Sequence, residues 1–279
     1  MSYRDQLLIK PGSKVKLADI DPDYHDKDLN KARSKPELQL ILDDISRMQE
    51  ELYAEKKHGL LIVLQGIDSA GKDGICWHVI TGMNPQGCTV SSFKQPSAEE
   101  LAHDFLWRVH AKTPGRGHVA VFNRSHYEDV LVVRVHDLVP KKVWFRRYEA
   151  INMFEELLAN NGVHIIKFFL YISKEEQLER FAKRLEDKDR QWKISMSDYA
   201  EREHWDAYTE AYEDMLSKCS TSHAPWYVIP SNRKWFRNLA AASIIRDTLR
   251  DMHIKAPPPT VDIDTIRQRY HAAVAEQKG

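Results

Sequence analysis

The residues from Gly66 to Asp73 combine glycines, a lysine and two acids at a spacing that suits phosphate chemistry. The segment reads Gly66-Ile-Asp68-Ser-Ala-Gly71-Lys72-Asp73. Glycines let the backbone turn tightly and bring its N–H groups close to a phosphate. Lys72 adds a full charge on a flexible stem. Asp73 stands where such loops usually carry a Ser or Thr whose hydroxyl binds Mg²⁺.

Two carboxylates in this loop, Asp68 and Asp73, would repel a bound phosphate unless a cation lay beside them. Mg²⁺ is a hard cation that takes carboxylate and phosphate oxygens as ligands. The loop therefore predicts a site for phosphate plus a metal, with Mg²⁺ as the expected ion and Mn²⁺ as a substitute. A glycine-rich turn that binds nothing is the alternative, and the strand before the loop and the helix after it disfavour that interpretation.

A second polar cluster follows the apolar run 118–123. It reads Asn-Arg-Ser-His-Tyr-Glu-Asp over residues 123–129. In open α/β sheets ligands bind at the carboxyl ends of strands, so this cluster predicts a site. Arg124 is placed to stabilise charge on a transferring phosphoryl group. Glu128 is a candidate third carboxylate, although an acid in the first turn of a helix has the same appearance.

Cations dominate residues 174–194. Arg180 and Arg184 are four residues apart, so they share one face of a predicted helix, and Lys193 follows in a charged loop. A solvated charged helix is the ordinary explanation for such a run. Its position after a strand of a phosphate-loop protein favours a mobile lid over about 178–196 whose cations close on phosphates.

The hydrophobic pattern predicts the strands and helices that must position these residues. Apolar runs predict strands at 60–64, 88–93, 118–123, 164–171 and 226–230, and helical spacing appears over 36–57, 98–110, 140–161, 197–218 and 234–253. Strands that alternate with helices predict a parallel, doubly wound α/β sheet. We expect a P-loop kinase fold, with a five-stranded parallel sheet sandwiched by helices, a thymidylate-kinase-like layout and a helical lid.

Three parts of the chain are expected from these elements. Residues 1–34 are predicted to form an extended N-terminal arm. Residues 35–255 form the P-loop kinase domain. Residues 256–279 form a C-terminal tail that begins at a Pro triplet and carries a short helix over 262–276.

The composition of the 279 residues restricts the classes of partner. Lys and Arg number 41, as do Asp and Glu, so the formal net charge is zero and gives no support for nucleic-acid binding. The three cysteines show no C-x-x-C spacing, which predicts reduced thiols in a cytoplasmic protein. No apolar run approaches the length of a membrane span.

At this point several motifs together resemble one family, the family-2 polyphosphate kinases. The loop 66–74 resembles their Walker A sequence, and residues 122–129 resemble their Walker B region. Residues 93–97 with 104–108 are similar to their acceptor-side segment, and residues 180–193 are similar to their lid. The block from Ala224 to Trp235 is similar to their last shared motif. The likeness extends over about residues 10–255.

The resemblance implies reversible, Mg²⁺-dependent transfer of the terminal phosphoryl group of inorganic polyphosphate to a nucleotide. The expected catalytic residues are Asp68, Lys72, Asp73, Arg124 and Glu128. The expected metal ligands are Asp68, Asp73 and Glu128. The polyphosphate would be bound by Ser69, Ala70, Gly71, Lys72, Arg180, Arg184 and Lys193. The nucleotide would be bound by Lys94, Arg108, Asn123, Arg124, Glu128 and Arg233. A cytoplasmic homo-oligomer, a dimer or a tetramer, is also implied.

One departure refines this expectation. Many members of the family have Asp where this chain has the uncharged Asn123, and either Glu128 or Asp129 could supply the missing carboxylate. The motif looks like that of the third class, which phosphorylates both mono- and diphosphates, so AMP and ADP are the expected acceptors. Two alternatives stay open at this point: an ATP-dependent nucleoside-monophosphate kinase, and a non-catalytic polyphosphate- or nucleotide-binding module.

Overall fold

Strand β2 (Gly59–Gln65) lies in the middle of the sheet and is buried at every residue. In the computed structural model, which describes residues 2–277, β2 pairs in parallel with β4 (Val119–Asn123) and with β5 (Val163–Tyr171). The outer strands are β3 (Cys88–Ser92) beside β4 and β6 (Trp226–Pro230) beside β5. The carboxyl end of β2 therefore opens between two neighbours that end at the same edge of the sheet.

The five predicted parallel strands are all present, but the prediction of a five-stranded sheet is wrong. A sixth strand, β1 (Leu8–Ile9), pairs with β6 in the antiparallel direction, and the order is β1-β6-β5-β2-β4-β3. The sheet is therefore mixed. A strand of two residues within a polar segment is too short to give an alternating pattern, which is why the sequence did not reveal it.

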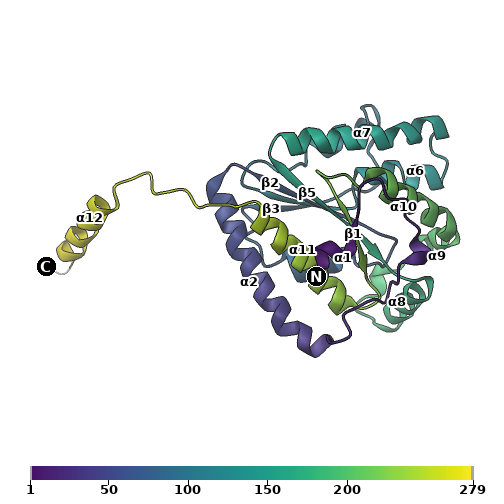
Figure 1. The fold of residues 1–279 in the computed structure, drawn as a ribbon, viewed down its shortest axis with the longest axis horizontal. Helices are drawn as coiled ribbons and strands as arrows, with labels where there is room; N and C mark the ends of the chain where they lie inside the picture. The colour runs from purple at the N-terminus through teal and green to yellow at the C-terminus, as the bar shows by residue number, and fades with distance from the viewer. Residues whose placement is uncertain (1, 278–279) are drawn as a thin grey trace.

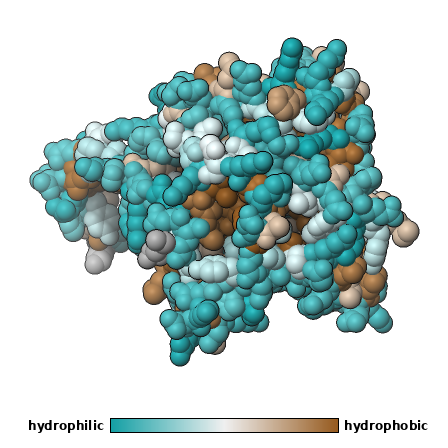
Figure 2. Space-filling view, turned by 45° about the vertical axis from the view of Figure 1, so that its right-hand side comes forward, coloured by the Kyte–Doolittle hydropathy of each residue, from teal (hydrophilic) through white to brown (hydrophobic). Residues whose placement is uncertain are grey.

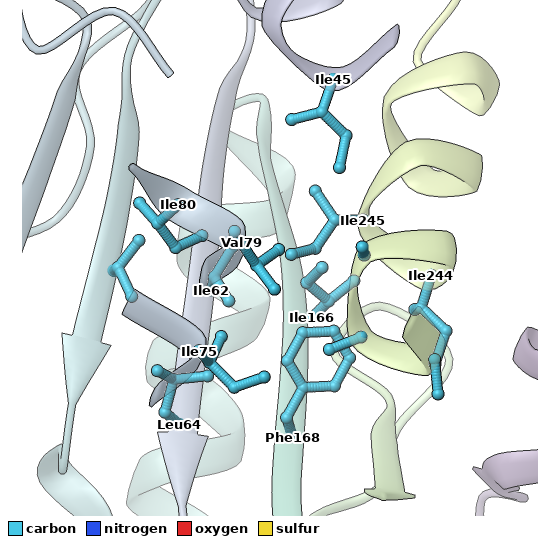
Figure 3. Packing of buried hydrophobic residues seen from close by; sticks show 14 of the residues in the cluster. Ile45, Ile62, Leu64, Ile75, Val79, Ile80, Ile166, Phe168, Ile244 and Ile245 are labelled. Carbon is cyan, nitrogen blue, oxygen red and sulfur yellow. The ribbon is translucent and has the colours of Figure 1, made fainter. Parts of the chain in front are cut away.

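Side chains of β2 point alternately to the two faces of the sheet. Leu60, Ile62 and Leu64 join one hydrophobic core, under helices α2 (Lys31–Glu55) and α11 (Lys234–Asp251). Figure 3 shows Ile62 and Leu64 packed with Ile166, Phe168 and Ile245 in this core.

Leu61 and Val63 join a second core on the other face. Helices α7 (Lys141–Asn160) and α10 (Trp205–Cys219) contribute to that core. Helices thus cover both faces of the sheet, as Figure 1 shows.

Two predicted helices are each divided in the structure. The predicted helix 98–110 is α4 (Ala98–Leu101) followed by α5 (Trp107–His110), because the Asp104 side chain accepts a hydrogen bond from the Leu106 N–H and closes a turn between them. The predicted helix 197–218 is α9 (Met196–Glu203) and α10, separated at His204.

The region expected to be a lid contains α8 (Lys174–Glu186), the 3₁₀ turn η4 (Gln191–Lys193) and α9. After the glycine loop, α3 (Lys72–Ile75) continues as the π-helical turn η2 (Cys76–Ile80). Residues 123–129 end in the 3₁₀ turn η3 (His126–Asp129), before α6 (Val132–Val135). All the polar clusters found in the sequence therefore lie beyond the carboxyl ends of strands.

The two ends of the chain differ in whether they contact the rest of the structure. The N-terminal segment, expected as an extended arm, contains α1 (Tyr3–Leu7), β1 and the 3₁₀ turn η1 (Leu17–Asp19), and it lies against the body. In contrast, α12 (Ile263–Glu276) stands away from the body at the end of an extended connection (Figure 1).

Hydrophilic side chains cover most of the face in Figure 2, and hydrophobic ones gather in a hollow near its centre. Within residues 2–277, no helix is long and apolar enough to cross a membrane.

Candidate functional site

The loop from Gly66 to Gly71 leaves β2 through backbone conformations that require glycine. Gly66 has φ of +151° and Gly71 has φ of +114°, in the region that L side chains rarely adopt. A Cβ at Gly66 would also lie 2.6 Å from the carbonyl oxygen of Leu170. The two outer glycines of the motif are thus fixed by backbone conformation, and the first also by the neighbouring strand β5.

Helix α8 holds the carbonyl groups of the loop. Gln177 Nε2 donates to the Asp68 carbonyl at 3.0 Å. Arg180 Nη1 donates to the carbonyls of Ser69 and Ala70 at 2.7 and 3.0 Å. Because C=O and N–H point in opposite directions across a planar trans peptide, the N–H groups that follow these carbonyls point away from α8. The Ala70 N–H donates to the Ile67 carbonyl at 3.0 Å, so the loop presents the N–H groups of Ser69 and Gly71 on the side where an anion would bind.

Lys72 begins α3 and is 8% exposed. Its Nζ donates to the carbonyl oxygen of Gly66 at 2.5 Å and to that of Ile67 at 3.3 Å. Burial, reinforced by the nearby charge of Arg124, lowers the pKa of the Lys72 ammonium to about 8. The lysine is held by its own loop, at the position from which it could reach a phosphate.

Arg124 brings the second cluster to the first. Its φ is +62°, a conformation rare outside glycine, and it lies just beyond β4. Nη2 pairs with Asp68 Oδ1 at 2.6 Å, and Nη1 pairs with Glu128 Oε2 at 3.3 Å. Burial lowers the pKa of this guanidinium, but the charges of Glu128 and Asp68 outweigh burial and raise it. Arg124 therefore stays a cation between two carboxylates.

Two amide side chains also contact the carboxylates at the junction, the place where the glycine loop after β2 meets the turn after β4. Asn123 Nδ2 donates to Asp73 Oδ1 at 2.8 Å, so the uncharged residue orients a carboxylate. Gln65 Nε2 donates to Glu128 Oε1 at 3.0 Å and to Ser125 Oγ at 3.2 Å. Gln65 was missed by the sequence analysis. Its signal was available, because it is the polar residue that ends the apolar run directly before Gly66.

The two acids of η3 point to different places. Glu128 contacts Arg124 and Gln65 and so belongs to the junction. Asp129 is 8% exposed and pairs with Arg147 at 2.9 Å. Burial raises the pKa of the Asp129 carboxyl, although the charge of Arg147 opposes this. Of these two acids, the geometry places Glu128 beside the loop.

The carboxylates proposed as metal ligands are not gathered into a ready-made cluster. Within residues 2–277, no three His, Cys, Asp or Glu side chains are arranged to hold a metal. Asp68 faces Arg124, whereas Asp73 faces Asn123. Mg²⁺ usually takes only one or two protein carboxylates and completes its shell with phosphate oxygens and water. The pair Asp68 and Asp73 fits that donor set.

The lid cations differ in their surroundings. Arg180 is 5% exposed, and its guanidinium also donates to Glu176 and to the carbonyls of Ser231 and Asn232. Arg184 is half-buried and donates to the Lys193 carbonyl at 3.2 Å. Arg180 therefore organises the loop, and Arg184 and Lys193 lie at the surface.

The residues expected at the nucleotide do not all lie on the same side of β2. Arg108 is 9% exposed and donates to the Lys94 carbonyl at 2.8 Å, which leaves the exposed Lys94 side chain at the surface. Arg233 lies beyond β6, where it pairs with Asp23 at 2.8 Å. The structure therefore brings Lys94 and Arg108 together but separates Arg233 from them.

A buried cluster of charged and polar side chains contacts η3 from the interior of the protein. Lys167 Nζ pairs with Glu155 Oε2 at 2.5 Å, and Glu155 Oε1 accepts from Tyr127 OH at 2.9 Å and faces His126 Nε2 at 3.1 Å. Lys167 and Glu155 have no exposed side-chain surface. Burial alone would raise the pKa of the Glu155 carboxyl, but Lys167 and His126 outweigh it and lower that pKa. The group anchors the turn that carries Arg124 and Glu128.

An α/β fold with a lysine-bearing glycine loop, a convergent arginine and carboxylates is the arrangement of a phosphoryl-transfer enzyme. Comparison with known proteins narrows the class: the family description "Polyphosphate kinase 2" matches residues 28–257. The chain is 45% identical over 252 residues to an AMP/ADP-polyphosphate phosphotransferase of Meiothermus ruber, covering 90% of this chain and 94% of that one. It is 41% identical to an ADP-polyphosphate phosphotransferase of Rhodopseudomonas palustris, covering 91% and 92%.

The structural comparison agrees. The crystal structure of polyphosphate kinase 2 from Arthrobacter aurescens superposes with a TM-score of 0.92 at 40% identity, and covers 99% of this chain and 97% of that one. The chain belongs to the polyphosphate kinase 2 family. The family predicted from the motifs is thereby confirmed.

Proposed function

We propose that this protein transfers the terminal phosphoryl group of inorganic polyphosphate to nucleoside mono- and diphosphates, converting AMP to ADP and ADP to ATP. A phosphate oxygen of the acceptor attacks the terminal phosphorus, the bridging P–O bond breaks, and the shortened polyphosphate leaves with that bond's electron pair. The reverse reaction follows the same path. We also propose that the α/β fold of this chain is the P-loop kinase fold.

The observation that carries the proposal is the meeting of Lys72, Asp68 and Arg124 at one point. Phosphoryl transfer needs positioning and charge stabilisation far more than covalent chemistry. The loop N–H groups and Lys72 bind the donor's terminal phosphates. Arg124 stabilises charge on the transferring group, and Glu128 fixes Arg124. Mg²⁺ held by Asp68 and Asp73 would supply neutralising charge on the polyanion.

Acceptor choice and the remaining roles extend this proposal. The similarity to a relative named for both AMP and ADP supports both acceptors. Lys94 and Arg108 bind the acceptor's phosphates, whereas Arg184 and Lys193 bind the donor chain when the lid closes. The enzyme acts in the cytoplasm as a homo-oligomer, either a dimer or a tetramer.

The test is a phosphorylation assay with Mg²⁺ and AMP that compares polyphosphate with ATP as the donor and follows ADP and ATP over time. Formation of ADP and then ATP from polyphosphate is the expected result. ADP from ATP alone would make the protein a nucleoside-monophosphate kinase. ATP from polyphosphate and ADP, without any use of AMP, would remove the monophosphate half of the proposal.

A further inference from the structure

Arg237 is a buried cation that touches the glycine loop and takes no part in the site described above. It lies on α11 and is 2% exposed. A Cβ built at Gly71 would come within 1.8 Å of its Nη1, and a Cβ at Gly74 within 2.5 Å of its Nη2. The guanidinium therefore fills the space that the absent side chains of Gly71 and Gly74 leave open.

The charge of Arg237 has no carboxylate partner within residues 2–277. Its Nε and Nη2 both donate to the neutral amide oxygen of Asn238, at 3.1 and 2.8 Å. Burial, and then the charge of Arg180, lowers its pKa to about 9. An unpaired buried charge is costly, so its persistence beside a phosphate loop indicates an anionic ligand.

Lys234 stands one helical turn before Arg237, on the same side of α11. Partial desolvation lowers the pKa of its ammonium, and the charges of Arg180, Arg237, Lys183 and Arg190 lower it further. The cations of α8 and Arg190, the residue before η4, therefore lie close to the first turn of α11. Mutual repulsion of this kind is relieved when a polyanion binds.

Other arginines of α11 show that an unpaired cation is not the rule on this helix. Arg246 pairs with Asp247 at 2.8 Å, and Arg250 pairs with Asp44 at 2.6 Å. Ordinary structural cations on α11 thus have acidic partners. The two cations nearest the loop lack them within residues 2–277.

The topology separates this region from the expected nucleotide side. Helices α8 and α11 follow β5 and β6, on one side of β2, whereas Lys94 and Arg108 follow β3, on the other side. The loop lies between the two. A donor and an acceptor that meet at Lys72 would therefore approach from opposite sides.

We propose that Lys234 and Arg237 form a second phosphate subsite, which binds the part of a linear polyphosphate behind its transferred terminal group. Lys234, which is exposed, contacts the chain directly. Arg237 adds positive charge from beneath Gly71. The α8 and η4 cations continue the path. This inference rests on the proposed function, since it assumes that the long polyanion is the donor.

The test compares Lys234→Gln with the wild type, using donors of three phosphates and of several tens of phosphates. Losing one charge-assisted contact should raise KM for the long donor about ten-fold or more. The KM for the nucleotide and kcat should stay near wild type. Lys234→Arg should restore the KM for the long donor. Arg250→Gln, at the far end of α11 and paired with Asp44, is the matched control and should change neither constant.

Binding of the same donors without nucleotide, measured by calorimetry, separates this inference from the proposed function. If the wild type uses long polyphosphate and Lys234→Gln binds it equally well, the subsite is wrong and the function stands. If KM for the nucleotide rises instead, the subsite is also wrong. If the wild type neither binds nor uses polyphosphate, the function itself fails. Arg237→Lys, which keeps the charge, should weaken donor binding less than Arg237→Gln at equal thermal stability.

Discussion

Asp68 and Arg124 form an ion pair of 2.6 Å that joins the glycine loop after β2 to the turn after β4. The carboxylate proposed to hold the metal and the cation proposed to stabilise the transferring phosphoryl group thus neutralise each other. When a metal and a phosphate bind, each partner gains a stronger opposite charge nearby. The pair therefore keeps both groups in place before the substrates arrive.

Arg124→Lys should lower kcat about 10³-fold, because Lys cannot reproduce the forked contacts with two carboxylates and a phosphate. The KM for the nucleotide should change far less. Steady-state rates with polyphosphate and ADP measure both constants. Arg47→Lys is the control, since Arg47 forms comparable contacts with Asp44 and Glu51 on the solvent-facing side of α2. A kcat close to wild type for Arg124→Lys would remove Arg124 from the reaction.

Asp68→Asn and Asp73→Asn should both raise the Mg²⁺ concentration needed for half-maximal activity, about ten-fold or more, because a carboxylate binds the metal far better than an amide. A Mg²⁺ titration at saturating substrates gives this value. Asp73→Asn keeps the size of the side chain that faces Asn123. An unchanged Mg²⁺ requirement in both variants would contradict the proposed metal site.

Loss of charge at Glu128 should affect the rate of the reaction, whereas loss of charge at Asp129 should affect the stability of the fold. Glu128→Gln removes a carboxylate beside Arg124 and should lower kcat about 10²-fold with little effect on stability. Asp129→Asn leaves the half-buried Arg147 without a carboxylate partner, although its contact with the Asp129 carbonyl remains, and should lower the free energy of unfolding by about 1–2 kcal/mol. Steady-state kinetics gives kcat for both variants, and urea unfolding gives their free energies of unfolding. Equal kinetic effects would mean that Asp129 shares the role.

Arg180→Lys should be more damaging than Arg184→Lys. The Arg180 guanidinium contacts carbonyls of the glycine loop and of the segment after β6, whereas the half-buried Arg184 donates to the Lys193 carbonyl. Lysine has too few donors in the required geometry. We expect a fall in melting temperature of about 5 °C or more and a raised KM for polyphosphate in Arg180→Lys only. If melting temperatures are equal, Arg180 does not hold the loop.

Glu155→Gln should lower the free energy of unfolding at pH 7 by about 3–5 kcal/mol, because it leaves Lys167 charged and unpaired in the core. The pKa of the Glu155 carboxyl is lowered by folding, with Lys167 as the main stabilising charge. Its contribution is therefore complete above the unfolded pKa of about 4.5 and is lost as the pH falls through the folded pKa. The difference between wild type and variant, measured by denaturant unfolding, should narrow in acid. A difference that widens in acid would contradict the ion pair.

The strands and the order of the motifs were predictable because buried apolar runs and glycine spacing are local signals. The family was predictable for the same reason, since several motifs stood in one order. The antiparallel β1 was not, because two residues give no periodicity. Nor could the sequence show that Arg180 is buried against the glycine loop while Arg184, four residues later, is only half-buried. Their shared charge pattern is identical, and only the packing of α8 against the loop distinguishes them.

The closeness of Arg237 to Gly71 and Gly74 sets a rule for how these positions can vary in evolution. Gly74 has no positive φ, so its backbone would accept alanine. The added methyl group, however, would clash with the guanidinium of Arg237. An alanine at 74 should therefore be tolerated only beside a shorter residue at 237. The two positions form a coupled pair, in which each change is harmful alone and less harmful in combination. Relatives that have lost the arginine are where a larger residue should appear in this loop.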